Sequence, residues 1–308
     1  MVIIVVCENL VKIYKTEDIE VVALQGLDLT IEDGELMAII GTSGSGKSTF
    51  LNILGGLDRP TAGTILVDGK NLLKITDKEL IKYRRNVVGF MWQNNARNLI
   101  PYLTAIENVE LPMFLTGKTD RNRALELLDM VGMVHRKNSK LDQLSGGEQQ
   151  RIAMAIALAS NPKLFLADEP TGAVDTKTAS QLLDVFRHLN ETLKLTIVIV
   201  THDRQLSRKV NRVVAIRDGM TSSEFLMKKS YTEEMKEIDT EILDDSEGVH
   251  EELTVLDQYG RIQIPKEFLI TMGLTGKSKV KVQMEGGHIV VRTPNDLDGK
   301  TIVKDPGV

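Results

Sequence analysis

The stretch GTSGSGKST, at residues 41–49, has the residue types and spacing of a loop that holds phosphate groups. Its pattern, Gly-x-x-x-x-Gly-Lys-Ser, follows an apolar run and precedes residues with helical spacing. The glycines let backbone N–H groups point at phosphate oxygens, and the following helix adds the positive end of its dipole. The lysine can reach the β- and γ-phosphates, and the serine hydroxyl can bind Mg²⁺. We therefore predict that a nucleoside triphosphate is bound by Gly41, Ser43, Gly44, Gly46, Lys47, Ser48 and Thr49.

Two adjacent carboxylates end a second apolar run, KLFLADEP, at residues 163–170. Asp168 is placed to hold Mg²⁺ through water, and Glu169 is placed to polarise an attacking water molecule. Taken alone, an acidic pair at a strand end is often a solvent-exposed surface feature without a chemical role. The phosphate loop upstream favours phosphoryl chemistry instead.

These motifs need elements that position them, and residues 1–222 supply apolar runs that alternate with helical patterns and glycine turns. Strands that alternate with helices predict an α/β fold with a mostly parallel sheet. Ligands of such folds bind at the carboxyl ends of the strands, where both motifs fall. Residues 83–158 read mainly as helix and loop, so we expect an inserted helical subdomain at about 94–160. The predicted strands lie within 35–41, 163–170 and 195–203, and a helix is predicted within 48–57.

Charge and cysteine content narrow the function classes. The net charge of −5 and the pI of about 5.7 argue against a nucleic-acid footprint over the whole chain. Cys7 is the only cysteine, so no internal disulfide can form. The longest apolar runs fall far short of the ~20 residues that cross a membrane, and no signal peptide is read at the N-terminus. If this protein acts at a membrane, we expect it to do so by binding a partner protein.

A third motif, LSGGEQQR at 144–151, separates the possible families. Its serine and two glycines can present a hydroxyl and bare N–H groups at a helix start, which makes a second anion site. On these motifs residues 1–222 resemble the ATP-binding-cassette (ABC) ATPases, whose core is a P-loop NTPase fold and whose signature motif this segment resembles. The resemblance implies a homodimer in which two cassettes meet head to tail. Each ATP would then lie between one phosphate loop and the partner's Ser145, Gly146 and Gly147.

Four further residues match positions of that family. Tyr14, in KIYKTED, resembles the aromatic residue that stacks on adenine, although an exposed loop tyrosine is the plain alternative. Gln93, in MWQNN, resembles the lid glutamine that contacts Mg²⁺ and the attacking water. His202, in IVTHD, resembles the switch histidine on the γ-phosphate. Asp175, in TGAVD, resembles the aspartate that crosses the dimer interface, with Val174 where the family commonly has leucine.

The segments at 57–69, 91–113 and 144–175 resemble the cassettes that power MacB/LolD-type exporters. That branch implies a separate transmembrane permease, so the cassette would lie at the cytoplasmic, inner face of the cell membrane. The cargo of such exporters is a lipoprotein, a peptide or an antimicrobial. A non-transport ABC protein of translation or repair would usually carry two fused cassettes, a long coiled coil or a zinc module, and none of these is read in this sequence.

After the predicted cassette (1–223), the composition changes twice. Residues 224–252 hold eleven carboxylates against three lysines and predict an acidic linker whose first half could be helical. Residues 253–294 then predict two hairpins around a short helix at Lys266–Met272, and 295–308 form a tail. The first hairpin would pair LTVLD with RIQIP across the turn at 258–260. On GRIQIPKEF (260–268) this small β-rich unit resembles the AbrB/SpoVT swapped-hairpin domain.

Two uses of that domain remain open in the sequence. About forty residues bury little core alone, which favours pairing with a second copy that tethers the cassettes. The resemblance also implies DNA binding, and a soluble ATPase that regulates a DNA-binding tail is the alternative function. Eight basic and eight acidic residues between 251 and 308 give no net charge, which disfavours DNA as a partner.

Overall fold

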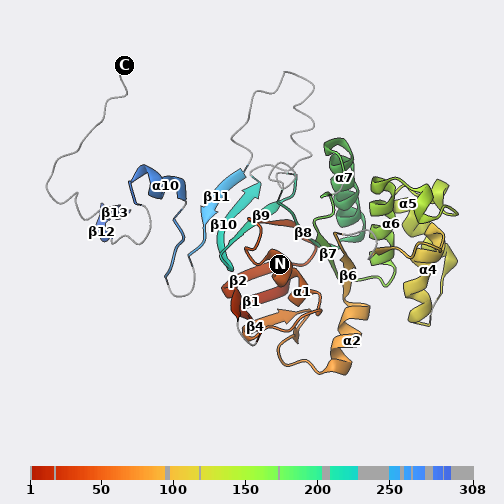
Figure 1. Ribbon diagram of the computed structural model, residues 1–308, viewed down its shortest axis with the longest axis horizontal. Coiled ribbons are helices and arrows are strands. Elements are labelled where there is room, and N and C mark those ends of the chain that lie inside the picture. The colour runs from red at the N-terminus through yellow and green to blue at the C-terminus, as the bar shows by residue number, and fades with distance from the viewer. Residues whose placement is uncertain are drawn as a thin grey trace, which may run out of the picture. The chain divides into compact units, whose positions relative to one another are not determined.

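The computed structural model divides the chain into two units, residues 1–257 and 258–308, which are described separately (Figure 1). In the part of the chain that the structure describes, no helix is long and apolar enough to cross a bilayer. The structure describes residues 2–16, 19–93, 98–117, 119–172, 174–202, 209–227, 250–256, 260–264, 266–274, 280–286 and 288–292.

The first unit is built on a sheet of seven strands. Five neighbouring strands run parallel and two more extend one edge in antiparallel pairing. In spatial order the strands are β11 (His250–Thr254), β10 (Met220–Met227), β9 (Arg212–Arg217), β3 (Leu36–Ile40), β8 (Thr196–Val200), β7 (Leu164–Asp168) and β6 (Val88–Met91).

A second, antiparallel sheet of four strands and a set of helices complete the unit. The strands of the smaller sheet are β2 (Glu20–Glu32), β1 (Ile3–Lys15), β4 (Ala62–Val67) and β5 (Lys70–Asn71) in spatial order. The helices are α1 (Lys47–Leu54), α2 (Asp77–Asn86), α4 (Ala105–Leu115), α5 (Arg121–Met130), α6 (Gly146–Leu158) and α7 (Thr176–Leu193), with short 3₁₀ turns η1 (Val134–Arg136) and η2 (Leu141–Gln143).

Strand β3 shows why the parallel sheet is covered on both faces. All five of its residues are buried, as a strand between two layers requires. Leu36, Ala38 and Ile40 belong to the core that the sheet shares with α4 to α7. Met37 and Ile39 point the other way, into the core shared with α1 and the smaller sheet. The phosphate loop that follows β3 is therefore anchored by a strand with no exposed face.

The expected α/β fold is confirmed, and the strands and helix predicted around the motifs lie where they were expected. Helices α4, α5 and α6 pack on one another within the predicted helical subdomain. The prediction of helix and loop for 83–158 was wrong at Val88–Met91, which forms the parallel edge strand β6. Four apolar residues are too few for periodicity to separate a buried strand from a helix.

The prediction of a linker from residue 224 was also wrong at its ends. Residues 224–227 lie in β10, and residues 250–252 lie in β11, which pairs with β10 and forms one edge of the large sheet. Leu253 and Thr254 belong to the same strand and pair with β10, and no strand covers residues 261–264 with which the first hairpin was expected. Residues 228–249, between the two strands, lie outside the described part of the chain.

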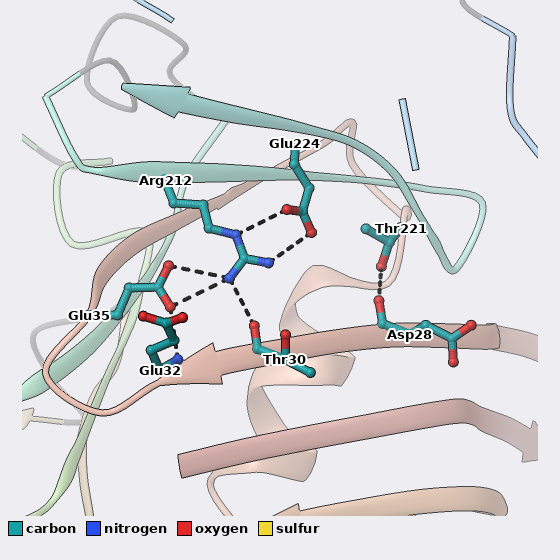
Figure 2. Close-up of polar contacts among 7 residues, drawn as sticks. All are labelled: Asp28, Thr30, Glu32, Glu35, Arg212, Thr221 and Glu224. Carbon is teal, nitrogen blue, oxygen red and sulfur yellow. Dashed lines mark hydrogen bonds and ion pairs between the residues drawn. The ribbon is translucent and has the colours of Figure 1, made fainter. Parts of the chain in front are cut away.

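An ion-pair cluster fastens this edge of the sheet to the rest of the unit (Figure 2). Arg212 of β9 donates to both carboxylate oxygens of Glu224 in β10, at 3.2 and 2.8 Å. Its other amino group lies 3.3 Å from a carboxylate oxygen of Glu35 and 2.9 Å from the Thr30 carbonyl oxygen in β2. Thr221 adds a bond from its hydroxyl to the Asp28 carbonyl, at 2.7 Å. Charge compensation by Arg212 explains how Glu224, predicted in a solvated linker, sits in a strand.

The second unit contains the predicted short helix, α10 (Lys266–Thr271), and one predicted hairpin, β12 (Lys281–Glu285) with β13 (His288–Arg292). Both predictions are confirmed. Three apolar side chains of the hairpin are largely exposed, with exposed fractions of 62–73% at Val282, Met284 and Ile289. The expected turn residues 258 and 259, Pro265 and the tail at 295–308 lie outside the described residues.

Candidate nucleotide-binding site

Four neighbouring parallel strands deliver the predicted site residues to one edge of the sheet. In the order β3, β8, β7 and β6, these strands are followed by the phosphate loop, His202, the Asp168–Glu169 pair and Gln93. Parallel strands end at the same edge, where ligands of open α/β sheets bind. The order in space differs from the order along the chain, in which Gln93 comes second.

The backbone of the phosphate loop leaves a helix start open to an anion. Helix α1 begins at Lys47 and is preceded by Gly46, in a left-handed conformation with φ of 103° and with no side-chain cap. The first-turn N–H groups of a helix have no intrahelical acceptor, so an uncapped start offers them to an anion. At Gly41, an added Cβ would lie 2.3 Å from the carbonyl oxygen of Ile216, so only glycine fits there. Ser43 and Gly44, by contrast, are exposed.

Lys47 is buried, and its ammonium group bonds to the loop itself. It donates to the carbonyl oxygens of Gly41 and Thr42 at 2.8 and 2.9 Å. Burial lowers the pKa of Lys47, while the Glu169 and Asp168 carboxylates oppose that shift. An ammonium enclosed in this way is a strong donor for an anion entering the loop.

Ser48 and Asp168 are brought together although 120 positions separate them in the chain. The Ser48 hydroxyl donates to a carboxylate oxygen of Asp168 at 3.3 Å. Burial raises the pKa of Asp168, and the Ser48 hydrogen bond works against this shift. A hydroxyl and a carboxylate beside a phosphate loop form a donor set that suits Mg²⁺.

Glu169 is the centre of a second cluster. Its carboxylate oxygen Oε2 lies 2.9 Å from His202 Nδ1 and accepts a hydrogen bond from Gln93 Nε2 at 3.4 Å. The Glu169 backbone has a φ of 45°, which residues other than glycine rarely adopt. The Glu169 N–H donates to the Val200 carbonyl oxygen at 2.9 Å. Such strain is found preferentially at functional sites. The turn carries the chain out of the sheet immediately after Asp168.

Tyr14 lies partly exposed beside the loop helix. Its hydroxyl donates to Asp58 at 2.7 Å, and the Lys12 ammonium lies 4.7 Å from the ring centroid and 2.6 Å from the same carboxylate. Burial and the Asp58 hydrogen bond raise the pKa of Tyr14, and a hydrogen bond with the Thr49 side chain lowers it. The ring is thus held close to the helix that begins at Lys47.

The signature residues lie on different elements. Ser145 caps α6, and Gly146 and Gly147 begin that helix. Helix α6 packs mainly against α4, α5, α7 and β6, whereas α1 packs mainly against β2, β7 and β8 (Figure 1). Asp175 caps α7 by accepting from the N–H and hydroxyl of Thr178, which lower its pKa. The structure therefore gathers the phosphate loop, Asp168, Glu169, His202 and Gln93, and carries Ser145 and Asp175 on helix starts of their own.

Two supporting residues had no signal in the sequence. Asp58 fixes the hydroxyl of Tyr14 from a loop 44 positions away. Asn98 holds the residue before Gln93, because its side-chain amide accepts from the Trp92 N–H at 2.9 Å and donates to the Trp92 carbonyl at 2.7 Å. Their roles depend on chain segments that only the fold brings together.

Comparison with known proteins agrees with this geometry. A family model described as ABC transporter matches residues 24–172. The ATP-binding protein MJ0796 of Methanocaldococcus jannaschii is 46% identical over 224 residues, which cover 70% of this chain and 94% of that protein. LolD of Pseudoalteromonas translucida, from a lipoprotein-releasing system, is 40% identical over 70% of this chain and 94% of its own length. MacB of Syntrophobacter fumaroxidans, a macrolide export ATP-binding/permease protein, is 41% identical, but the match covers only 31% of its length.

The solved structures add the state in which one relative was seen. MJ0796 has a dimeric structure in a post-hydrolysis state bound to ADP and Pi, which superposes with a TM-score of 0.66 at 42% identity and covers 73% of this chain and all of that one. The chain described here belongs to the ATP-binding proteins of ABC transporters. It is an ABC-type ATPase.

Proposed function

We propose that this protein is the ATP-hydrolysing subunit of an ABC transporter of the MacB/LolD branch, and that it works as a head-to-tail homodimer on a separate membrane permease. The contact of Glu169 with both His202 and Gln93, at the strand edge that carries the phosphate loop, is the observation that carries the proposal. This contact supports the proposal that Glu169 is the general base, His202 the switch and Gln93 the lid residue beside a bound γ-phosphate.

Each side chain of the site has a proposed role that follows from its chemical groups. Lys47 and the first-turn N–H groups of α1 bind the phosphates. Tyr14 packs against the adenine ring. Mg²⁺ would be held by Ser48, Gln93 and Asp168, and it would neutralise phosphate charge. Glu169 accepts the proton of the attacking water, and the His202 ring keeps the Glu169 carboxylate oriented.

The distribution of anion sites supports the head-to-tail dimer. Helix α1 starts without a side-chain cap, and α6 starts with the Ser145 cap followed by two glycines whose N–H groups have no intrahelical acceptor. The two helices pack against different elements. A second copy can bring its α6 start to the phosphate loop of the first, and the dimeric structure of MJ0796 supports dimerisation of this chain.

A complementation experiment tests the head-to-tail arrangement. Lys47→Ala removes the phosphate ligand and Ser145→Arg blocks the signature, so each variant alone is expected to be inactive. A mixed dimer would contain one composite site with both halves intact, so mixing the two is expected to restore ATP turnover to a substantial fraction of the parental rate. Titrating one variant against the other while measuring phosphate release checks this result. Failure to regain turnover, with both variants shown to be folded, would contradict a shared site.

The permease is proposed from the relatives. LolD belongs to a lipoprotein-releasing system and MacB joins an ATP-binding part to a permease in one chain. By analogy, this cassette would bind a transmembrane partner at the inner face of the cell membrane, with a lipoprotein, peptide or antimicrobial as cargo. Co-purification of a membrane permease with the full chain is the direct test of that partnership.

We further propose that the second unit, as an AbrB-like domain, tethers the two cassettes. Val282 pairs with Val291 and Met284 pairs with Ile289, so these side chains share one face of the hairpin. That face is apolar and largely exposed, as a surface that pairs with a second copy would be. A tail dimer would keep the cassettes at high effective concentration after ADP release.

Ile289→Lys is expected to abolish dimerisation in the absence of ATP, because it places a charge in the middle of this apolar face. His288→Lys is the matched control, since it introduces the same residue one position earlier, on the opposite face of the strand and also exposed. Sedimentation of both variants without nucleotide gives the readout. Equal dimerisation of the two would exclude this face as the tether.

A further inference from the structure

Arg136 and Glu148 form an ion pair next to the signature serine. Arg136 Nε lies 2.9 Å from Glu148 Oε1, and the other carboxylate oxygen, Oε2, accepts the backbone N–H of Ser145 at 2.8 Å. The Glu148 N–H in turn faces the Ser145 hydroxyl oxygen at 3.3 Å. The carboxylate therefore joins the end of η1 to the start of α6.

These bonds determine what the start of α6 has left to offer a ligand. The capping box uses the N–H groups of Ser145 and Glu148. Gly146 and Gly147 occupy the first two helical positions, where N–H groups have no intrahelical acceptor. An anion at this helix start would meet those two N–H groups and the Ser145 hydroxyl.

The same geometry places a negative charge where an anion is expected. Glu148 is in the first turn of α6, and the Ser145 backbone N–H, together with Arg136, holds the pKa of its carboxyl below the usual range. The group is therefore ionised at neutral pH. A carboxylate in this position repels a triphosphate unless a cation compensates it.

We propose that Arg136 is a positioning residue of the ATPase, which neutralises Glu148 so that the signature motif can receive the triphosphate bound by the partner copy. The inference rests on the proposed head-to-tail dimer. Arg136 acts through Glu148 and Ser145, and the ligand chemistry it permits is a nucleoside triphosphate at the start of α6.

The backbone around Arg136 is held in place for this role. The next residues return to the start of α4, where Ala105 and Ile106 donate their N–H groups to the carbonyls of Ser139 and Lys137, both at 2.9 Å. The Arg136 N–H also bonds to the Met133 carbonyl at 3.0 Å. A guanidinium on a fixed turn can hold a carboxylate in one orientation with less loss of side-chain freedom than a lysine.

The experiment measures the ATP concentration that gives half-maximal dimerisation of the full chain, in a Glu169→Gln, Ile289→Lys background that suppresses turnover and removes the proposed tail dimer. Arg136→Ala is expected to raise this concentration about five- to tenfold, because the Glu148 charge then faces the phosphates uncompensated. Arg136→Lys, which keeps the charge, is expected to shift it much less. Adding Glu148→Gln to Arg136→Ala is expected to bring the concentration back to within about twofold of Glu148→Gln alone.

The matched control is Arg121→Ala, which breaks an ion pair of 3.0 Å with Glu110 in the same group of helices. It is expected to leave the half-maximal ATP concentration unchanged. Affinity for labelled ATP, measured on dilute monomer, is expected to be the same in all variants because the phosphate loop is intact.

Each result that differs from these expectations contradicts a particular part of the proposal. If Arg136→Ala leaves dimerisation unchanged, or if Glu148→Gln fails to rescue it, Arg136 has no charge-neutralising role. Loss of nucleotide affinity in the Arg136→Ala monomer would show a role in the whole fold and would overturn positioning. If the Glu169→Gln, Ile289→Lys parent itself does not dimerise with ATP, the head-to-tail proposal fails first, and this inference fails with it.

Discussion

Replacing Glu169 by glutamine is expected to lower ATP turnover by about 10²–10⁴-fold, which is the usual contribution of a positioned general base. Glutamine keeps the size and the carbonyl oxygen that Gln93 and His202 contact, so the site keeps its shape. It cannot accept the proton of the attacking water. Nucleotide binding is therefore expected to survive, and the variant should accumulate as an ATP-bound dimer.

Phosphate release measures turnover. Sedimentation with ATP, in a chain that also carries Ile289→Lys so that the tail does not dimerise it, measures accumulation of the ATP-bound dimer. Glu126→Gln serves as the control, because Glu126 is a carboxylate in an exposed ion pair with Arg123 on α5, outside the site. It should behave as the parent. Parental turnover by Glu169→Gln would show that another group takes the proton and would remove Glu169 from the proposed mechanism.

Lys47→Ala is expected to abolish nucleotide binding, and with it turnover, for two reasons that the geometry separates. The ammonium is the only side-chain cation proposed to contact the phosphates, and loss of one preorganised donor costs about 10²–10³-fold in rate. Its bonds to the Gly41 and Thr42 carbonyls also hold the loop, so the alanine variant loses the loop conformation as well.

Titration with labelled ATP distinguishes this variant from Glu169→Gln, which should still bind. Lys163→Ala is the matched control, because Lys163 pairs with Asp68 at 2.7 Å on the surface and makes no contact with the loop. Tight ATP binding by Lys47→Ala would contradict the role assigned to the ammonium. A fall in thermal stability without nucleotide would report the lost loop contacts separately.

Much of this site could be predicted from the sequence because its motifs are local. A glycine-rich loop between an apolar run and a helical pattern fixes its own context, and the Asp168–Glu169 pair marks the end of a strand by itself. Asp58 and Asn98 could not be predicted, since their partners are reached only through the fold. The left-handed backbone conformation of Glu169 could not be predicted either, because no residue type in the sequence indicates it.

The edge strands show the same limit. The run of carboxylates from residue 224 to 252 suggested an acidic linker. Charged residues are rarely buried without a partner. Arg212 provides that partner for Glu224. For Leu253 and Thr254, composition predicted pairing with the segment that follows, whereas they pair with β10, which precedes them in the chain. The backbone hydrogen bonds of a strand can be made with a near or a distant segment of the chain. The tertiary structure therefore decides which segment a strand pairs with.

The sequence by itself determined which residues are predicted to bind phosphate, which carboxylates stand at strand ends, and where a second anion site is predicted, at 145–147. Only the tertiary structure decided their neighbours. It inserted β8 between β3 and β7 and put β6 at the edge, so His202 and Gln93 meet on Glu169 although 109 positions separate them. The physical reason is that burial and crossover geometry set strand order in a parallel sheet, whereas the local sequence sets only where each strand ends.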